Sequence, residues 1–527
     1  MLIDSDKIAL IREGKEISYH TLLQKIYVVS NTLNDIKEND KVLVFSEPRI
    51  GYAYALFSIW AKKASYSTWF HNLNADFLKT ILEDIKPVAV FVSKKTYPLL
   101  KQALEKITKE QLNLTFEENT KFFHPKVILI NELEKIPVTD NTPIADLQLD
   151  ASNIAFIVYT AGITNKHKPI ELSFSNIMYV YNELIKNGYY KPDDKVLSYL
   201  PFYNNWILLS TLVFPLLCGC TCVFATDNIE NIIKNISNHK VSIVVAVKKV
   251  YTDLLELLQT KKLFNTNTLK YKIISKINNK KISEIAYKKI HNLLGNSIRY
   301  FLTVGAKVVE EIYVPMLALG FEIFEGYGMA ETSSLITYPT SKRTDAEYVG
   351  KILNGLEYKI INNELVLNGE NIGKQYYNRN ELNKITFNNE WFFTNDVIEI
   401  EDNGMIKLLG RVGDEVVLKS GRVVVLAELE SKLDKMKDYI NECGVFFDDN
   451  IFKIVIVPAM NMIETYGVED HYLVIHSILR WKVIEHYNHG VQPYKRITNV
   501  IITEQKLPRS TSGKIKRYLL KDFEYNV

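Results

Sequence analysis

Short apolar runs rich in β-branched residues alternate with segments of helical periodicity through most of the chain. Clear examples are residues 41–45 (KVLVF), 88–92 (VAVFV) and 241–246 (VSIVVA). Apolar runs of this length predict buried strands, and strands that alternate with helical patterns pack as parallel sheets covered by helices. The pattern therefore predicts the α/β fold class, with a large N-terminal region of parallel-type sheets and helices.

After about residue 345 the pattern changes to short strands separated by turn signals. Residues 364–367 (ELVL) and 397–400 (VIEI) predict strands, and Asp402-Asn403-Gly404 follows the second of them. An Asn-Gly pair between such runs favours a hairpin. We therefore predict a small β-rich subdomain in this part of the chain.

The C-terminal part mixes a helical pattern from about Ala427 with an apolar run at residues 453–457 (KIVIV). This mixture predicts a small α+β domain. We place the joint near residues 410–414, so that residues 1–410 form the N-terminal domain and 411–527 the C-terminal domain.

One apolar stretch requires a test for membrane insertion. Residues 206–225 are almost wholly apolar and have nearly the length that spans a bilayer, but Pro215 and Gly219 interrupt them. A buried helix that leads into a buried strand accounts for both interruptions. We therefore predict no transmembrane segment and no signal peptide, and leave peripheral membrane contact open.

The four cysteines predict a reducing, cytoplasmic setting. Cys218, Cys220 and Cys222 alternate, as metal ligands or disulfide partners sometimes do, yet neither His nor a carboxylate lies among them. Residues two apart on a strand share a face, so we interpret the three as small side chains packed in a core.

Charge argues against nucleic acid as a partner. The formal net charge is +3 and the pI about 8.3, with no basic stripe strong enough to indicate phosphate-backbone binding.

Two loops carry candidate phosphate and nucleotide chemistry. Residues 159–169 (YTAGITNKHKP) follow an apolar strand, and their hydroxyls, glycine and lysines suit triphosphate binding. Residues 325–332 (EGYGMAET) combine glycines, which allow close backbone approach, with Tyr327 for a purine and Glu331 for magnesium. Each taken alone is equally an ordinary loop.

Two further segments lie in the C-terminal third. Residues 391–396 (WFFTND) and 410–414 (GRVGD) supply Asp396, a natural partner for ribose hydroxyls, and Arg411, which suits a phosphate or the same ribose. Residues 507–517 (LPRSTSGKIKR) are basic and contain Ser and Gly. Such a tail, standing alone, is usually a solvated surface.

In this order and spacing the four motifs resemble those of the adenylate-forming superfamily, which comprises acyl-CoA synthetases, firefly luciferase and nonribosomal-peptide adenylation domains. The resemblance covers nearly the whole chain, and residues 507–515 (LPRSTSGKI) are its most specific part. Residues 303–307 and 410–421 are most similar to the long-chain fatty acyl-CoA synthetases.

The resemblance implies ATP-dependent activation of a small-molecule carboxylic acid, a fatty acid by its nearest motifs. The acyl-adenylate then passes its acyl group to the thiol of CoA or of a phosphopantetheine-bearing acyl carrier protein. Mg²⁺ is the implied metal. The C-terminal domain is implied to be a mobile lid that swings between the two half-reactions.

Individual roles carry over from the resemblance. The catalytic residues are Lys514, at the carboxylate and α-phosphate, Glu331, as the metal ligand, and Asp396, at the ribose. ATP or AMP would contact Thr160, Gly162, Thr164, Lys168, Gly305, Ala306, Glu325, Gly326, Tyr327, Gly328, Met329, Asp396, Arg411 and Lys514. The acyl pocket would include Phe202, Asn204, Trp206, Gly326 and Met329, with Asp414 at the hinge and Gly421 on the side of the thiol.

The chain departs from the family pattern in several positions. Ala161, Ile163, Asn165, His167 and Pro169 replace family hydroxyl, glycine and proline residues in the phosphate loop, Ala330 replaces a threonine, and Asn395 replaces a glycine. Loss of one buried, charge-assisted phosphate donor costs about 1–3 kcal/mol, or roughly ten- to a hundredfold in rate.

The departures leave alternatives open. A non-catalytic adenylate- or acyl-binding protein on this scaffold is one, and a ligase specific for an acyl carrier protein is another. A nucleic-acid ligase requires a Lys-x-Asp-Gly motif, which is absent from the sequence. Because the lysine, both carboxylates and the arginine are all retained, we favour a divergent but active enzyme.

Overall fold

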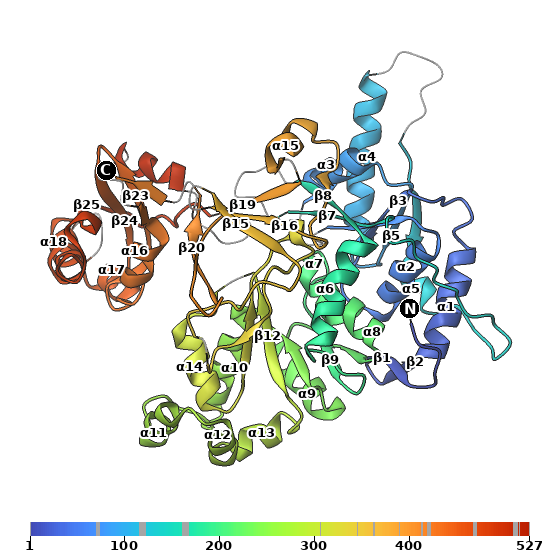
Figure 1. Ribbon diagram of the computed structural model, residues 1–527, viewed down its shortest axis with the longest axis horizontal. Helices are drawn as coiled ribbons and strands as arrows, with labels where there is room; N and C mark the ends of the chain where they lie inside the picture. The colour runs from blue at the N-terminus through green and yellow to red at the C-terminus, as the bar shows by residue number, and fades with distance from the viewer. Residues whose placement is uncertain are drawn as a thin grey trace. The chain divides into compact units, whose positions relative to one another are not determined.

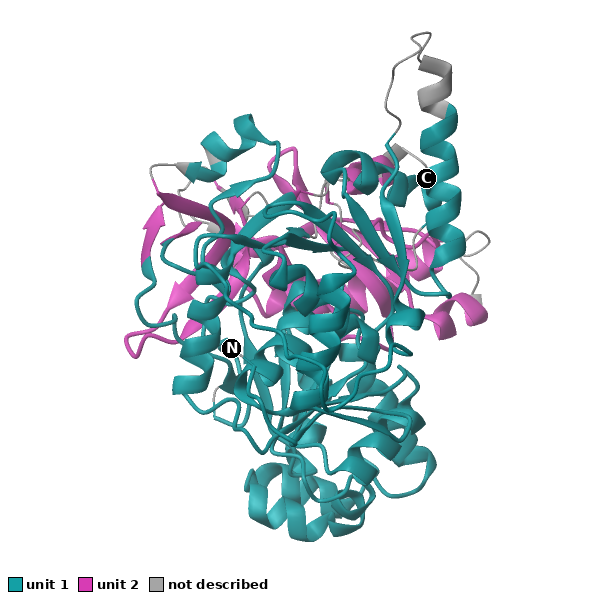
Figure 2. Ribbon diagram, turned by 90° about the vertical axis from the view of Figure 1, so that its right-hand side faces the viewer, with its two compact units in different colours: residues 1–160, 169–357, 368–387 teal, residues 161–168, 358–367, 388–527 magenta. Residues whose placement is uncertain are grey.

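The computed structural model describes residues 2–69, 74–114, 123–160, 168–305, 307–344, 346–361, 364–388, 390–412, 415–418, 423–466, 472–509, 515 and 517–525. The chain forms two compact units (Figure 2). Unit 1 comprises residues 1–160, 169–357 and 368–387, and unit 2 comprises residues 161–168, 358–367 and 388–527.

Unit 1 is built on two sheets (Figure 1). The first has the order β14 (Thr340–Ser341), β13 (Ile323–Gly326), β12 (Tyr300–Val304), β11 (Ile243–Val245), β9 (Lys195–Ser198), β10 (Thr221–Phe224), β1 (Ile8–Arg12), β2 (Lys15–Ser18). The second has the order β17 (Gln375–Tyr376), β8 (Pro169–Ser173), β7 (Ile154–Tyr159), β4 (Ser65–Thr68), β3 (Lys41–Phe45), β5 (Ala89–Val92), β6 (Lys126–Leu129).

The interior strands of both sheets pair in parallel, and antiparallel pairs occur only towards their edges, at β1–β2, β13–β14, β7–β8 and β8–β17. Strands β3, β5 and β7 are buried on both faces, which explains their continuous apolar sequences, and β4 is equally buried although its sequence is SYST. The predicted α/β class is therefore confirmed.

Helices pack on these sheets. Their bounds are α1 (Tyr19–Asn31), α2 (Ile50–Ala61), α3 (Ala75–Ile85), α4 (Tyr97–Leu114), α5 (Ile130–Leu133), α6 (Phe174–Lys186), α7 (Asn205–Leu208), α8 (Phe214–Cys218), α9 (Ile229–His239), α10 (Lys248–Thr260), α11 (Leu269–Ile277), α12 (Lys280–Ala286), α13 (Lys288–Leu293), α14 (Glu310–Ala318) and α15 (Asn380–Thr386). Helix α3 shows the underlying logic, since Asn74 caps its first turn and its buried residues Leu78, Ile81, Leu82 and Ile85 recur at helical spacing.

The apolar stretch at 206–225 is a buried helix followed by a strand, as predicted. Helix α7, a π-helical turn (Leu209–Val213) and α8 run into β10, and Gly219 ends α8 in the left-handed conformation. Among the described residues, no helix has both the length and the apolarity needed to cross a bilayer.

All four cysteines are free thiols, and Cys220 and Cys222 are fully buried, which confirms the packing interpretation for these two. The prediction that Cys218, Cys220 and Cys222 share one face of a strand is wrong, because α8 extends to Cys218 and, of these three, only Cys222 lies in a strand.

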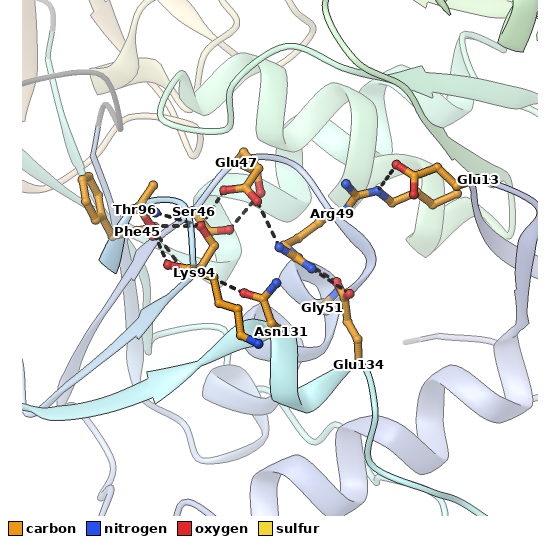
Figure 3. A network of polar contacts seen from close by, with 12 residues as sticks. Glu13, Phe45, Ser46, Glu47, Arg49, Gly51, Lys94, Thr96, Asn131 and Glu134 are labelled. Carbon is orange, nitrogen blue, oxygen red and sulfur yellow. Dashed lines mark hydrogen bonds and ion pairs between the residues drawn. The ribbon is translucent and has the colours of Figure 1, made fainter. Parts of the chain in front are cut away.

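A buried ionic network fixes the connections after β3 and β5 (Figure 3). The Arg49 guanidinium donates to both carboxylate oxygens of Glu134, at 2.7 and 2.8 Å, and to Glu47 at 3.0 Å. Glu134 also accepts from the Gly51 amide, and Glu47 accepts from the Ser93 hydroxyl. The network joins α2, α5 and the end of β5 in one rigid corner.

Unit 2 contains most of a small antiparallel sheet and the C-terminal region. The sheet has the order β15 (Glu357–Ile361), β16 (Glu364–Asn368), β19 (Trp391–Ile400), β18 (Phe387–Asn388), with β20 (Ile406–Arg411) also paired to β19. The predicted β-rich subdomain and its hairpin at Asp402-Asn403-Gly404 are confirmed, because β19 and β20 pair on either side of that turn.

The C-terminal region is α+β, as predicted. Its strands are β21 (Glu415–Val417) with β22 (Val423–Val425), and β23 (Ile440–Asp448), β24 (Ile451–Pro458), β25 (Ile497–Ile502). Its helices are α16 (Leu426–Leu433), α17 (Met460–Tyr466), α18 (Tyr472–Ile478) and α19 (Glu485–His489), with a π-helical segment at Leu479–Ile484 and 3-10 turns at Pro493–Lys495 and Arg517–Tyr525. The boundary at residue 410 was predicted as the point about which the C-terminal domain rotates, and it stays a prediction. The predicted hinge residue, Asp414, lies outside the described residues.

Candidate active site

The loop after β13 brings the backbone of Gly328 against the backbone of a following turn. The Tyr327 amide donates to Thr337 Oγ1 at 2.9 Å, and its carbonyl accepts from the Ile336 amide at 2.7 Å. A Cβ atom at Gly328 would lie 2.2 Å from the carbonyl oxygen of Ser334, so no side chain fits there. Glycine is required here by this contact, and Tyr327 itself is only 6% exposed.

The same loop continues into a 3-10 turn (Ala330–Thr332) that carries Glu331. The hydroxyl of Tyr376 donates to Glu331 Oε1 at 2.8 Å. Tyr376 is buried in β17, next to β8, and packs edge-on against Phe387. The second carboxylate oxygen of Glu331 has no partner within the described part of the chain, so a rigid phenol holds the carboxylate with one oxygen available.

Glu325 lies at the end of β13 in a buried ion pair. Lys342 Nζ is 3.3 Å from its carboxylate, and the Val308 amide donates to it at 2.9 Å. Lys342 also donates to the carbonyls of Ala346 and Tyr348. Burial raises the pKa of Glu325, while Lys342 opposes that rise. The pair ties β13, the segment after β12 and the segment after β14 together.

Three of the five predicted acyl-pocket residues lie between β9 and the π-helical turn, and the other two, Gly326 and Met329, lie at the end of β13 and in the loop after it. Phe202 is buried and packs edge-on against Tyr52 at 4.7 Å between ring centroids. Asn204 is exposed and caps α7 by accepting from the Trp206 amide at 3.0 Å. Trp206 is buried, and its indole N–H lacks a hydrogen-bond partner in the part of the chain that the structure describes.

Asn205, which the sequence analysis did not single out, links this region to the loop of Glu331. Its amide nitrogen donates to Ser334 Oγ at 2.8 Å, whereas its side-chain oxygen is buried without a partner among the described residues. Two buried polar atoms, one donor and one acceptor, are thus available to a ligand on α7.

The predicted ribose residues form a pair within unit 2. Asp396 and Arg411 are cross-strand partners of β19 and β20, and Arg411 Nε lies 2.6 Å from Asp396 Oδ1. Asp396 is buried and Arg411 partly exposed. The pair holds a carboxylate and a guanidinium at the end of one hairpin, which suits a ligand that carries vicinal hydroxyls and a phosphate.

The remaining nucleotide residues are placed only in part. Thr160 is buried directly after β7, Lys168 is half-buried directly before β8, and Gly305 follows β12 with a φ of 96° and open space where a side chain would be. Gly326 ends β13, and Met329 precedes the 3-10 turn. Gly162, Thr164, Ala306, Asp414, Gly421 and Lys514 lie outside the described residues.

One carboxylate is enough for the metal that the family pattern implies. In the described ranges, no group of three or more His, Cys, Asp or Glu side chains is arranged to hold a metal ion. Mg²⁺ bound with substrate phosphates takes only one or two protein carboxylates and keeps several waters. The available oxygen of Glu331 therefore fits Mg²⁺ of this kind.

A cavity of about 600 Å³ lies at the carboxyl ends of β9 and β10. Tyr199, Pro201, Phe224 and the polar face of α9 contribute to its lining. None of the predicted site residues is among those that line it, so it is separate from the site described above.

Three residues of the site were missed at the level of sequence. Tyr376 and Lys342 act through contacts with residues 45 and 17 positions away, and Asn205 through one 129 positions away. No local pattern signals such contacts. The only hint was that residues 373–378 (GKQYYN), which contain Tyr376, are among those that carry the resemblance to the superfamily.

Unit 1 has two parallel-type sheets and a glycine-containing loop whose carboxylate is held in place. Unit 2 has an Asp–Arg pair and an α+β end. These features together define the class of adenylate-forming enzymes. The chain belongs to the AMP-binding enzyme family, to which residues 4–377 match. The predicted superfamily, and with it the prediction of an AMP-forming ligase, is confirmed.

Curated relatives are CoA ligases of several kinds. The 2-succinylbenzoate–CoA ligase of Bacillus pumilus (strain SAFR-032) is 23% identical over 98% of this chain and 96% of its own. Human mitochondrial malonate–CoA ligase ACSF3 is 21% identical over 98% and 90%. The long-chain-fatty-acid–CoA ligase FadD15 of Mycobacterium bovis is 21% identical over 76% and 69%.

Solved structures share the fold. The O-succinylbenzoate coenzyme A synthetase MenE from Bacillus subtilis, in complex with AMP, has a TM-score of 0.73 at 20% identity and covers 98% of this chain and 96% of its own. ATP-bound MatB from Rhodopseudomonas palustris has a TM-score of 0.75 at 19% identity, with 99% and 96% covered.

Proposed function

We propose that the protein activates a carboxylic acid with ATP and transfers the acyl group to the thiol of CoA. In the first step a carboxylate oxygen attacks the α-phosphorus of ATP, and the bond to the bridging oxygen breaks to release pyrophosphate. In the second step the thiol sulfur attacks the acyl carbon, the thiol loses its proton, and AMP leaves with the former carboxylate oxygen. Mg²⁺ supplies charge neutralisation on the phosphates.

The observation that carries this proposal is the Glu331 carboxylate, held by Tyr376 beside the close backbone contact at Gly328. A fixed carboxylate with one available oxygen next to a glycine loop suits a metal–triphosphate group. The Asp396–Arg411 pair supports a ribose and phosphate role in the same reaction. Lys514 is assigned from its motif alone, as the cation that stabilises charge developing at the α-phosphate.

The identity of the acid is the finer question. The long-chain motif style and the similarity to FadD15 favour a fatty acid. The Trp206 indole N–H and the Asn205 oxygen, which have no partner among the described residues, instead favour an acid with a second polar group, such as the succinylbenzoate and malonate named for other relatives. A buried polar atom left unpaired costs about 1–3 kcal/mol, so a ligand that pairs both is preferred over a bare alkyl chain.

The test is ATP–pyrophosphate exchange over a panel of straight-chain fatty acids, succinylbenzoate and malonate, followed by CoA-dependent release of AMP. We expect exchange with at least one acid, and its loss in Lys514→Ala but not in Lys506→Ala, an exposed lysine of the same segment. Tight AMP binding without exchange for any acid would establish the non-catalytic alternative. Acyl transfer to a carrier protein but not to CoA would change the acceptor. We also propose a reducing, cytoplasmic setting, supported by the free thiols.

A further inference from the structure

Two consecutive helices of unit 1 expose a row of aliphatic side chains. In α11, Leu269, Ile273 and Ile277 recur every four residues along one face and are 73%, 49% and 45% exposed. In α12, Ile282 and Ile285 are 41% and 78% exposed. These five side chains are called the aliphatic stripe below. Scattered apolar side chains are normal on a surface, but five in 17 residues form a patch that indicates binding.

The stripe is on the outer side of both helices. Ile274 of α11 and Ser283 of α12 are buried, and both helices pack against α14 through that inner side. Asn278 adopts the left-handed conformation at the end of α11, and Asn279 caps α12, so the chain reverses sharply between the two. In Figure 1 α11 and α12 lie at the lower edge of the molecule, next to α13 and α14.

The same segment is strongly basic. Residues 269–289 contain seven lysines and one glutamate, a net charge of +6, whereas the whole chain has a net charge of +3. Lys272, Lys276 and Lys281 are exposed and flank the stripe. Lys280 is engaged by Glu322 at 2.7 Å, and Lys270 lies over the ring of Tyr287, so the flanking lysines are the ones available to a partner.

We propose that α11 and α12 bind the surface of a bilayer that contains anionic lipids. The aliphatic stripe enters the boundary between headgroups and acyl chains, and the flanking lysines contact lipid phosphate and carboxylate groups. Long lysine stems allow the ammonium groups to reach the headgroups while the helices lie along the surface. The proposal concerns a surface apart from the nucleotide residues and is independent of the proposed acid.

The composition of the patch favours lipid over protein as the partner. Protein interfaces are enriched in aromatic residues, Met and Arg and are depleted in Lys. Here the exposed apolar side chains are only Leu and Ile, and the cations are only Lys. Aliphatic residues beside lysines are instead the pattern of helices that lie in a membrane interface.

The test is co-sedimentation of the full chain with phosphatidylcholine vesicles, with and without phosphatidylserine. We expect binding only to the anionic vesicles and its loss at high salt, since screening acts over about 8 Å at physiological ionic strength. The Lys272→Gln/Lys276→Gln/Lys281→Gln variant should bind about 100-fold more weakly, from about fivefold per lysine. Ile273→Asn/Ile285→Asn should weaken binding without altering its salt dependence.

Matched variants separate these effects from general charge and apolarity. Lys37→Gln/Lys101→Gln/Lys186→Gln removes three exposed lysines elsewhere in unit 1, and Ile144→Asn removes an exposed isoleucine that is 40% accessible. Both should bind vesicles like the wild type. Equal binding to neutral vesicles, or equal loss in the matched variants, overturns the proposal. Failure of the wild type to sediment with anionic vesicles also makes the membrane assignment wrong. A wild-type dimer that Ile273→Asn/Ile285→Asn makes monomeric would instead show that the stripe binds a second copy of the chain.

Discussion

Replacement of Lys342 by methionine tests whether its pair with Glu325 is a buried electrostatic contact. The two side chains are 0% and 3% exposed, and their charged atoms lie 3.3 Å apart. Methionine retains most of the volume but removes the ion-pair partner of the Glu325 carboxyl. Removing one partner of a buried pair typically costs about 3–5 kcal/mol.

The electrostatic part of this loss has an upper limit, because the Glu325 carboxyl can take up a proton and become neutral. The free energy of that protonation, and so the limit, depends on pH. Keeping a glutamic acid of ordinary pKa, about 4.3, protonated costs about 1.4 kcal/mol for each pH unit above that pKa. The limit is therefore about 3.7 kcal/mol at pH ~7 and about 1.6 kcal/mol at pH ~5.5. The lost bonds to the carbonyls of Ala346 and Tyr348 add a loss of about 1–3 kcal/mol that does not depend on pH.

The sign follows from proton binding in the two states. In the variant the folded-state pKa of Glu325 rises further, because burial is no longer opposed by Lys342. The folded state then binds more protons than the unfolded state, so stability falls as pH rises from the ordinary pKa of glutamate to the raised one. We expect the loss of unfolding free energy to be larger at pH ~7 than at pH ~5.5, by at most about 2 kcal/mol.

Equilibrium unfolding in urea, followed by tryptophan fluorescence at both pH values, measures this difference. Lys280→Met is the matched control, because Lys280 pairs with Glu322 at 2.7 Å while the two side chains are 34% and 24% exposed. Its loss should be at most about 1 kcal/mol. A Lys342→Met loss that is the same at both pH values, or no larger than that of the control, would refute the buried-pair reasoning.

Three further substitutions test other parts of the structure. Gly328→Ala forces a methyl group against the Ser334 carbonyl and should lower the rate of pyrophosphate exchange by roughly 10- to 100-fold, whereas Gly490→Ala, whose nearest neighbouring atom is at 3.5 Å, should not. Burial opposes ionisation of Glu134, but Arg49 and the Gly51 amide hold its pKa below the ordinary value. The ionised Glu134 therefore stabilises the folded state above the unfolded-state pKa, and this stabilisation is lost as pH falls through the folded-state pKa. Arg49→Met should therefore flatten the acid limb of the stability profile measured by urea unfolding; an unchanged limb contradicts this. Tyr376→Phe should raise the Mg²⁺ concentration needed for half-maximal exchange about tenfold, while Tyr377→Phe should leave it unchanged.

Strands β3, β5 and β11 could be predicted because each is buried on both faces and therefore appears in the sequence as a continuous apolar run, whereas the equally buried β4, with the sequence SYST, could not. Residues 41–45 form β3 as predicted. The other predicted runs agree to within two residues at their ends, except that residues 397–400 are only the end of the longer strand β19 (Trp391–Ile400). Strand β8 was missed. Its sequence, PIELS, has no clear alternation, and it is stabilised by pairing with β7 and with Gln375–Tyr376, about 200 positions further along.

The candidate site likewise contains residues that the sequence alone reveals and residues that only the fold brings together. The glycine loop, Glu331, Asp396 and Arg411 were found because the superfamily motifs are short and continuous in sequence. The groups that hold them, Tyr376 and Lys342, are joined to them only by the fold. Asn204 illustrates the opposite case, since its observed contact is a local helix cap that the sequence alone would have allowed.

The pairing of Tyr159 with Pro169 has a consequence for how this lineage could diverge. The two ends of the intervening segment are anchored to adjacent, hydrogen-bonded strands, so the sheet is specified without it. Residues 161–167 can therefore differ between relatives while the two points of attachment, Tyr159 and Pro169, keep the same register in the sheet.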